Sequence, residues 1–219
     1  MGLSRQQVAT DAVQEISVVS MDITRTAIDG VRIVKPRVFG DARGFFVESF
    51  SAQRYAEALD VAPDAFVQDN VSHSAKGVLR GLHFQRAPYA QGKLVSVLRG
   101  AVWDVAVDLR PASPTYGRYV GVVLRAPRYD DAAGGWVWEQ FWVPHGFAHG
   151  FVALEGETTF TYKCAHNVYT PESDAGVRWD SPTLDIAWPL AENGITAPLV
   201  SEKDAQLPLF DTDTDYGAV

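Results

Sequence analysis

Residues 101–109, Ala-Val-Trp-Asp-Val-Ala-Val-Asp-Leu, decide the fold. Trp103, Val105 and Val107 occupy alternate positions, whereas Asp104 and Asp108 fall on the positions between them. A period of two residues is typical of a β-strand, because successive side chains point to opposite faces. The stretch therefore predicts a half-buried antiparallel strand with one apolar face and one face that carries two carboxylates.

Similar runs lie on both sides of this strand. Gly, Pro or Asp residues separate them, and they cover residues 93–99, 118–124, 136–143, 147–154 and 158–165. Many short strands without helices between them indicate a β-sandwich or jelly roll. The fold class is therefore predicted to be all-β.

The remaining segments complete the predicted organisation. Residues 51–59 predict a helix that begins at a capping serine, Ser51. Residues 31–34 alternate like a strand but have no obvious local partner, so we expect them to add to the sheet of a partner subunit. Residues 1–25 have no clear period and are expected to form a mobile N-terminal extension or a short helix, which leaves residues 26–219 as a single domain.

Composition narrows the class of protein. A net charge of −8 argues against a nucleic-acid partner, although the stretch from Lys76 to Arg99 is basic, without acidic residues, and suits a small anionic ligand. The single cysteine, Cys164, excludes an intramolecular disulfide and a cysteine-based zinc cluster. No apolar run approaches the roughly 18 residues of a membrane span, and polar residues interrupt residues 1–20. We therefore expect a cytoplasmic protein with no membrane partner.

Three separated segments carry side chains suited to moving a proton next to a carbonyl group. His83 lies in Gly-Val-Leu-Arg-Gly-Leu-His-Phe-Gln (residues 77–85), Lys93 follows shortly after, and Tyr162 lies in Phe-Thr-Tyr-Lys-Cys (residues 160–164). An imidazole is a base near neutral pH, an ammonium stabilises an oxyanion, and a phenol can return a proton. Taken singly, each also has a structural reading as a polar side chain on a strand.

Together with further blocks, these segments closely resemble the dTDP-4-dehydrorhamnose 3,5-epimerase family of cupin-fold sugar-nucleotide enzymes. The resemblance extends from about residue 26 to residue 210, and its blocks are residues 36–46, 67–70, 77–85, 101–110, 142–151, 162–164 and 201–204. It implies a cupin-type double-stranded β-helix, or jelly roll, with a few short peripheral helices. It also implies a homodimer that needs no metal and no cofactor.

The resemblance assigns roles to four residues. His83 matches the base, Tyr162 the proton donor, and Lys93 the group at the keto oxygen. Asp204 matches the carboxylate that holds the imidazole in one tautomer, although it lies far away in sequence. The implied reaction converts dTDP-4-dehydro-6-deoxy-D-glucose to dTDP-4-dehydro-L-rhamnose, in L-rhamnose biosynthesis, through an enolate.

A second set of residues matches positions that contact the substrate in the resembled family. The set is Arg43, Glu48, Gln68, Asn70, Arg80, His149, Tyr169, Asp174 and Lys203. Three of its cations suit a diphosphate, and Tyr169 matches an aromatic residue that stacks on thymine. Asp174 departs from the family, which has Glu there. Arg43 and Glu48 are expected to complete the site of the neighbouring subunit.

Three predictions concern particular segments of the chain. In an ideal strand Arg80 and His83 point to opposite faces, and a bulge at Gly81 would re-aim one of them. Residues 125–140 are longer than the connection expected in the family and predict an extended surface hairpin, with a lid or a subunit contact as alternatives. The tail over residues 211–216 is expected to be solvated.

Three other functions stay open. A metal-dependent cupin needs a His-x-His pair, but Gln85 occupies the second position after His83; His145 and His149 are four residues apart. A non-catalytic sugar-nucleotide-binding cupin would retain the barrel. A relative within the family would epimerise one carbon instead of two. The nucleotide base, the pathway and any oligomer beyond a dimer are not determined by the sequence.

Overall fold

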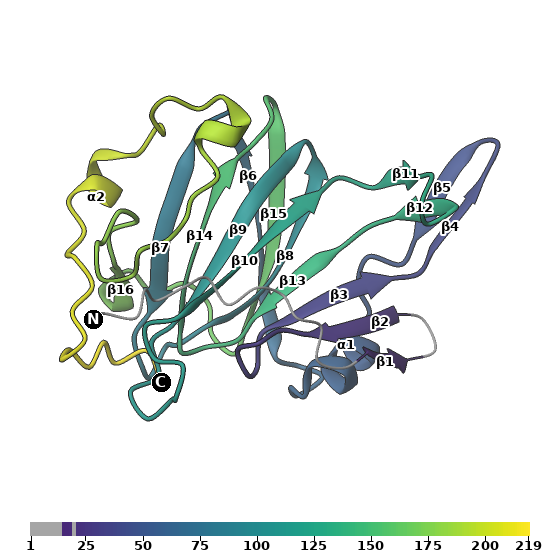
Figure 1. The fold of residues 1–219 in the computed structure, drawn as a ribbon. Helices are drawn as coiled ribbons and strands as arrows, with labels where there is room; N and C mark the ends of the chain where they lie inside the picture. The colour runs from purple at the N-terminus through teal and green to yellow at the C-terminus, as the bar shows by residue number, and fades with distance from the viewer. Residues whose placement is uncertain (1–14, 19–20) are drawn as a thin grey trace.

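The computed structural model describes residues 15–18 and 21–219, and two antiparallel sheets form its body (Figure 1). The larger sheet contains, in spatial order, β1 (Glu15–Val18), β2 (Met21–Arg25), β3 (Arg32–Pro36), β13 (Gln140–Val143), β8 (Gly92–Arg99), β15 (Thr158–Ala165) and β6 (Phe66–Ser74). The smaller sheet contains β10 (Tyr119–Arg125), β9 (Ala101–Asp108), β14 (Phe147–Ala153), β7 (Leu79–Gln85) and β16 (Asp174–Gly176).

Other elements are short and lie at the periphery. They are the hairpins β4 (Val38–Asp41) to β5 (Gly44–Val47) and β11 (Arg128–Asp130) to β12 (Gly135–Val137), the α-helices α1 (Ala52–Leu59) and α2 (Glu202–Ala205), and the 3-10 turns η1 (Pro171–Ser173) and η2 (Ala191–Asn193). The predicted all-β jelly roll with a few short peripheral helices is confirmed, as is the hairpin within residues 125–140. Within the described ranges, no helix has the length and hydrophobicity that crossing a membrane requires.

One core cluster lies between the two sheets. The larger sheet contributes Val95, Phe141 and Phe160, and the smaller sheet contributes Val102 and Phe151, all almost fully buried. A buried aromatic or aliphatic side chain of this size stabilises the folded state by about 1.5–3 kcal/mol. Burial of one face of each sheet against the other therefore holds the two sheets together.

Strand β9 corrects the prediction of a half-buried strand, because all eight of its residues are buried. It lies in the middle of its sheet, between β10 and β14. Its outer face packs under the C-terminal segment, where Trp103 contacts Trp188 with ring centroids 5.1 Å apart. Both carboxylates of the inner face are removed from solvent. Asp108 accepts hydrogen bonds from Arg110, Ser113 and Thr115, whereas Oδ2 of Asp104 has no hydrogen-bond partner among the described residues.

The N-terminal region corrects two further predictions. Residues 15–18 and 21–25 are strands of the larger sheet, not a mobile extension, because Met21 and Ile23 bury their side chains. Strand β3, which contains most of residues 31–34, pairs with β2 on one side and β13 on the other within the same chain. The prediction that this segment pairs with a partner subunit is therefore wrong. The rest of the predicted extension, residues 1–14 and 19–20, lies outside the described residues.

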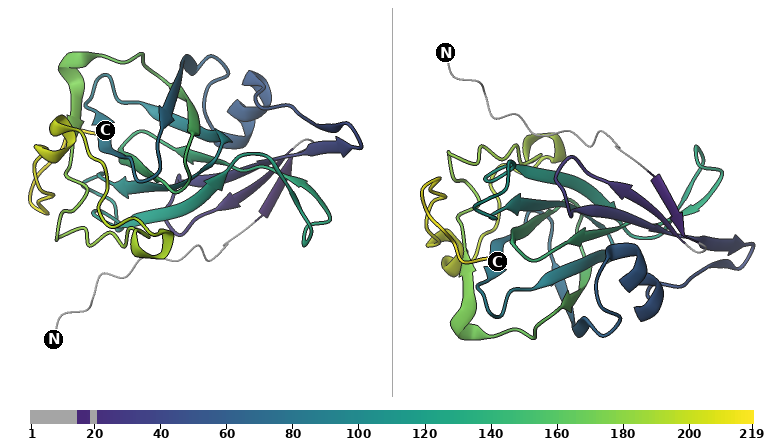
Figure 2. Two further views of the ribbon diagram at one scale, coloured as in Figure 1. Left: turned by 90° about the horizontal axis from the view of Figure 1, so that it is seen from above. Right: turned by 90° about the horizontal axis from the view of Figure 1, so that it is seen from below.

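The helix and the tail were predicted with different success. Helix α1 begins after Ser51 as expected, but the Ser51 side chain makes no capping hydrogen bond. The tail is solvated only in part, because Tyr216 stacks on Phe210 with ring centroids 5.5 Å apart and both rings are buried. Figure 2 shows this C-terminal segment, in yellow, at the end of the molecule opposite the two peripheral hairpins.

Candidate active site

Two adjoining clefts open between the sheets and meet at three side chains. One has a volume of about 430 Å³ and the other about 320 Å³. His83, Lys93 and Tyr162 line both. His83 comes from β7 in the smaller sheet, whereas Lys93 and Tyr162 come from β8 and β15 in the larger one. A molecule held at the junction is therefore flanked by the imidazole on one side and by the phenol on the other.

A bulge in β7 brings Arg80 and His83 to the same cleft. Arg80 pairs with Phe151 and His83 with His149, so β7 uses one residue more than β14 over this interval. Gly81, at φ +114°, absorbs the extra residue, and a Cβ there would lie 2.7 Å from the carbonyl oxygen of His149. Such a φ and such a close approach suit glycine. The bulge expected at Gly81 is confirmed.

The carboxylate of Asp204 orients His83. Its Oδ1 lies 2.7 Å from His83 Nε2, and its Oδ2 accepts a hydrogen bond of 3.2 Å from the Gly81 amide. Burial raises the pKa of Asp204, but the hydrogen bond and the charge of His83 outweigh burial, so the pKa lies below its usual value. A carboxylate can only accept, so Nε2 carries the hydrogen and Nδ1 keeps its lone pair. The pair therefore presents Nδ1 as a base.

The start of α2 holds Asp204 in place. Ser201 is the N-cap of this helix, and its hydroxyl accepts a hydrogen bond of 3.1 Å from the Asp204 amide. The Asp204 carboxylate is nearly buried, with 6% of its side chain exposed. This cap explains how a residue distant in sequence from His83 reaches the imidazole with a fixed geometry.

Lys93 and Tyr162 are neighbours on the opposite wall. The Lys93 ammonium lies 6.0 Å from the centre of the Tyr162 ring. Burial lowers the pKa of Lys93, which makes its ammonium a better hydrogen-bond donor. Burial raises the pKa of Tyr162, so its phenol is protonated at neutral pH. The wall therefore offers a cation and an acid.

The smaller cleft is lined mainly by neutral polar groups. Gln68 donates to Asn70 at 3.1 Å and accepts from the Tyr169 amide at 2.8 Å. Asn70 in turn lies 3.5 Å from the buried sulfur of Cys164. The Tyr169 ring is about half exposed at the rim. These contacts provide fixed donors and acceptors beside an exposed aromatic face.

Cationic groups lie at the mouth of the larger cleft. Arg80 is held by hydrogen bonds to the Ser74 hydroxyl and the His73 carbonyl, both of 3.2 Å. Lys203 is exposed and forms an ion pair with Asp174. Asp174 also accepts a hydrogen bond of 3.4 Å from Gln85. The aspartate that departs from the family pattern therefore contacts Lys203, which lines the larger cleft, and Gln85, which lines the smaller one.

A second imidazole–carboxylate pair, which sequence reasoning missed, lies behind the larger cleft. His149 Nε2 is 2.8 Å from Asp104 Oδ1, and both side chains are buried. Burial raises the pKa of Asp104, and His149 opposes this rise. The signal was present in the sequence as an aspartate inside an apolar strand, but the period of two placed it toward solvent.

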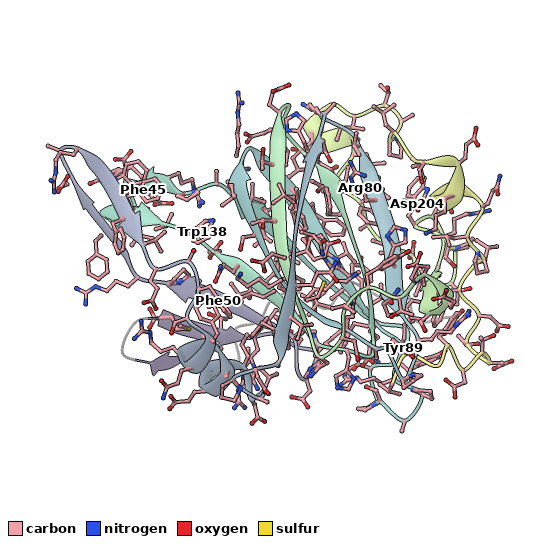
Figure 3. All side chains as sticks on the ribbon, turned by 180° about the vertical axis from the view of Figure 1, so that it is seen from behind. Phe45, Phe50, Arg80, Tyr89, Trp138 and Asp204 are labelled. Atoms are coloured by element: carbon pink, nitrogen blue, oxygen red, sulfur yellow. The ribbon has the colours of Figure 1, made fainter. Side chains whose placement is uncertain are left out.

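Arg43 and Glu48 do not join the cleft of their own chain. Arg43 lies at the tip of the β4–β5 hairpin and pairs with Asp41, and Glu48 pairs with Arg54 of α1 at 2.8 Å. Figure 3 places Phe45, near Arg43, at the end of the molecule opposite Arg80 and Asp204. Seven of the nine predicted substrate-binding residues therefore surround the clefts, and these two lie elsewhere.

No three potential metal-ligating side chains converge anywhere in residues 15–18 and 21–219. His145 is near His166, with ring centroids 5.4 Å apart, whereas His149 points to Asp104. The two histidines of the possible ligand pair are thus engaged with different partners. The donor set around the clefts fits proton transfer and anion binding better than metal ligation.

Comparison with known proteins agrees with this geometry. The family model described as dTDP-4-dehydrorhamnose 3,5-epimerase matches residues 25–212. The dTDP-4-dehydrorhamnose 3,5-epimerase of Shigella flexneri is 46% identical over 90% of this chain and 99% of its own length, and that of Pseudomonas aeruginosa is 49% identical over 87% and 96%.

Solved structures give the same result. The dTDP-6-deoxy-D-glucose-3,5-epimerase of Legionella pneumophila, in complex with dTDP-4-keto-L-rhamnose, has a TM-score of 0.75 and 49% identity over 86% of this chain and 92% of its own. The Bacillus anthracis dTDP-4-dehydrorhamnose 3,5-epimerase, with TDP and PPi bound, has a TM-score of 0.76 and 43% identity over 87% and 100%. The chain therefore belongs to the dTDP-4-dehydrorhamnose 3,5-epimerase family.

Proposed function

We propose that the chain converts dTDP-4-dehydro-6-deoxy-D-glucose to dTDP-4-dehydro-L-rhamnose by inverting C3 and C5. The observation that carries this proposal is the His83–Asp204 pair, 2.7 Å apart, opposite Tyr162 in one cleft. An epimerase needs a base on one face of the sugar and an acid on the other. His83 on the smaller sheet and Tyr162 on the larger sheet provide the base and the acid on opposite walls of the cleft.

The first step is removal of the proton on the carbon next to the keto group. Nδ1 of His83 takes the proton, the C–H electron pair moves into a C=C bond, and the carbonyl π electrons move to oxygen. Asp204 stabilises the imidazolium that results. Positioned general base catalysis of this kind contributes about 10²–10⁴-fold in rate.

Lys93 then stabilises the enolate oxygen. Its ammonium lies on the opposite wall, 6.0 Å from the centre of the Tyr162 ring. A donor aimed at an oxyanion in a site from which water is excluded contributes about 10²–10³-fold in rate. The reaction needs no oxidant or reductant, because the electron pair returns to the same carbon.

Inversion is completed from the other face. The Tyr162 phenol donates its proton to the carbon as the C=C electrons collapse onto it and the carbonyl re-forms. The imidazolium of His83 and the tyrosinate then exchange protons with solvent to restore the starting enzyme. The same pair serves C3 and C5 if the sugar turns or shifts between the two steps.

Other side chains of the clefts suit the diphosphate and the base of the substrate. Arg80 and Lys203 suit the diphosphate as charge-assisted donors. Tyr169 offers its half-exposed ring to the base, beside Gln68 and Asn70. His149 completes the wall of the larger cleft, and Asp174 holds Lys203 toward it.

Proton NMR in D₂O tests the reaction. The enzyme is expected to introduce deuterium at C3 and C5 of dTDP-4-dehydro-6-deoxy-D-glucose and to form the L-configured product. Tyr162→Phe is expected to allow deuterium exchange while blocking product formation, because it removes only the acid. No exchange at either carbon by the wild-type enzyme would reject the proposal.

A one-carbon epimerase is the second candidate. A dTDP-4-dehydrorhamnose 3-epimerase of Streptomyces niveus is 36% identical over 90% of this chain, against 46% for the Shigella flexneri protein. The same spectra separate the two, because a 3-epimerase would leave C5 unlabelled. The higher identity supports inversion at both carbons.

We also propose a homodimer in which Arg43 and Glu48 enter the partner's cleft. Support comes from the position of the β4–β5 hairpin, whose Phe45 lies at the end of the molecule opposite Arg80 and Asp204 (Figure 3). It also comes from the exposed rings of Phe39 and Phe46, which are paired across this hairpin. Exposed apolar patches of this kind mark interaction surfaces. A cytoplasmic location, expected from the composition, stays a prediction that cell fractionation would test.

Subunit mixing tests the exchange of Arg43. At substrate concentrations well below KM, Arg43→Ala and His83→Asn are each expected to be poorly active alone. A mixed dimer contains one site with His83 from the first chain and Arg43 from the second, so activity should return to about half of the wild-type value per dimer. No recovery on mixing would mean that Arg43 does not serve the partner.

A further inference from the structure

The β4–β5 and β11–β12 hairpins project from the same end of the molecule (Figure 1). Each is a separate two-stranded sheet, without ladder hydrogen bonds to either large sheet. An isolated two-stranded hairpin is marginally stable in water. The position of Arg43, which lies at the tip of the first hairpin, therefore depends on what packs against that hairpin.

Trp136 of β12 makes this packing contact. Its ring lies 4.8 Å from the ring of Phe45 and 6.3 Å from that of Tyr129. It also lies directly on the backbone of β4, because a Cβ built on Gly40 would be 2.1 Å from its Cδ1. Gly40 has ordinary backbone angles, so the space that the indole occupies is the reason that glycine suits this position.

The β11–β12 hairpin is itself fixed to the body of the protein. Trp138, two residues after Trp136, is buried and donates from Nε1 to the Val97 carbonyl of β8 at 3.0 Å. On the other side, the Ala126 amide donates to the Gly100 carbonyl at 3.0 Å, just before β11 begins. Trp136 therefore extends a rigid part of the larger sheet onto the β4–β5 hairpin.

The described hydrogen bonds of Arg43 lie within its own hairpin. Its backbone amide donates to Asp41 Oδ1 at 2.8 Å, and its guanidinium pairs with the same carboxylate. The Arg43 side chain is otherwise 90% exposed. The contact between Trp136 and Gly40 therefore connects the hairpin, and with it this guanidinium, to the body of the protein.

We propose that Trp136 is a positioning residue, which holds the β4–β5 hairpin so that Arg43 meets the diphosphate of the substrate bound by the partner. This role rests on the proposed function, in which Arg43 serves the partner's cleft. It assigns a purpose to residues 125–140: they support the hairpin, and do not act as a lid over the cleft of their own chain. Trp136 lines neither of the two clefts around His83.

Steady-state kinetics with the dTDP-4-keto sugar, combined with dTDP binding by calorimetry, test the proposal. Trp136→Ala should raise KM and the Kd for dTDP about tenfold, the size expected for a misplaced charge-assisted contact, and leave kcat within about twofold. Trp136→Phe, which keeps an aromatic ring against Phe45, should restore most of the affinity. A purely structural loss would instead lower kcat and the melting temperature together.

Two double variants show whether the effect passes through the named contacts. In an Arg43→Ala background, Trp136→Ala should raise KM no further, because the group that it positions is gone. Gly40→Ala should reproduce the Trp136→Ala effect, because its Cβ displaces the indole, and should have no effect once Trp136 is already Ala. The second cycle tests the same contact from the hairpin side, with a substitution on β4 instead of β12.

The outcomes separate this proposal from the one on which it rests. If Arg43→Ala raises KM but Trp136→Ala and Gly40→Ala do not, the positioning role is rejected and the proposed function stands. Additive effects of Trp136→Ala and Arg43→Ala would also reject it. If Arg43→Ala itself has no effect while deuterium exchange is normal, the role of both residues is rejected and the epimerase activity is retained.

Discussion

The cleft around His83 and the pair of hairpins β4–β5 and β11–β12 lie toward opposite ends of the molecule and are held in different ways. In the cleft, Asp204 is almost buried and accepts hydrogen bonds from both His83 and Gly81. At the hairpins, aromatic packing of Trp136 on Phe45 takes the place of such a network, and Phe46 is 69% exposed. The residues proposed for proton transfer come from one chain, whereas Arg43, on the hairpins, lies away from the cleft of its own chain.

The two regions are suited to different tasks, the cleft to proton transfer and the hairpins to binding the diphosphate. Proton transfer requires positions fixed to within a fraction of an ångström, and buried hydrogen bonds on two packed sheets provide them. A diphosphate contact tolerates more freedom, since an arginine side chain reaches its ligand through several rotatable bonds. Residues at the cleft should therefore control kcat, and residues at the hairpins should control KM and assembly.

The largest effect is expected at the base. His83→Asn should lower kcat at least about 10³-fold without changing the circular dichroism spectrum, because the amide cannot accept the proton. His73→Asn is the matched control, since His73 is an exposed histidine on β6 with one long contact to Glu157. A His83→Asn variant that keeps more than a tenth of wild-type turnover would exclude His83 as the base.

Next in size is the bulge that brings Arg80 and His83 together. Gly81→Ala should lower the free energy of unfolding by about 1–3 kcal/mol, because φ is +114° and the new Cβ meets backbone atoms at 2.7 Å. It should also reduce turnover, since His83 moves with the bulge. Gly156→Ala is the control: a Cβ there meets nothing within 4 Å. Equal stability of the two variants in urea denaturation would show that the bulge tolerates a side chain.

Much of this arrangement was predictable, and what was missed has a physical explanation. Local alternation was sufficient to predict most strands, and the bulge at Gly81 followed from the need to place Arg80 and His83 together. Alternation does not say whether the second face of a strand is solvated, so the burial of Asp104 in β9 was missed. Nor does it identify the partner of a strand, so β3 was expected to pair outside its own chain.

A smaller effect is expected from the pH dependence of the imidazole–carboxylate pair. The pKa of Asp204 is lowered in the folded state, so its charge stabilises the fold above the unfolded pKa of about 3.9 and this contribution is lost as the pH falls through the folded pKa. Asp204→Asn should therefore be less stable than wild type at pH 6, and the difference should shrink below about pH 4. Urea denaturation across this range measures it; a difference independent of pH would mean that the carboxylate charge does not contribute.

The smallest effect on the single chain is expected at the hairpins. Phe46→Ala removes a ring that is 69% exposed, so it should change the free energy of unfolding by less than about 0.5 kcal/mol. Phe141→Ala, at a fully buried position between the sheets, should cost about 3–5 kcal/mol. If a partner covers Phe46, the same substitution should instead shift the monomer–dimer equilibrium toward monomer in sedimentation experiments. A Phe46→Ala variant that dimerises like wild type would remove this ring from the interface and leave Arg43 without a route to the partner's cleft on this face.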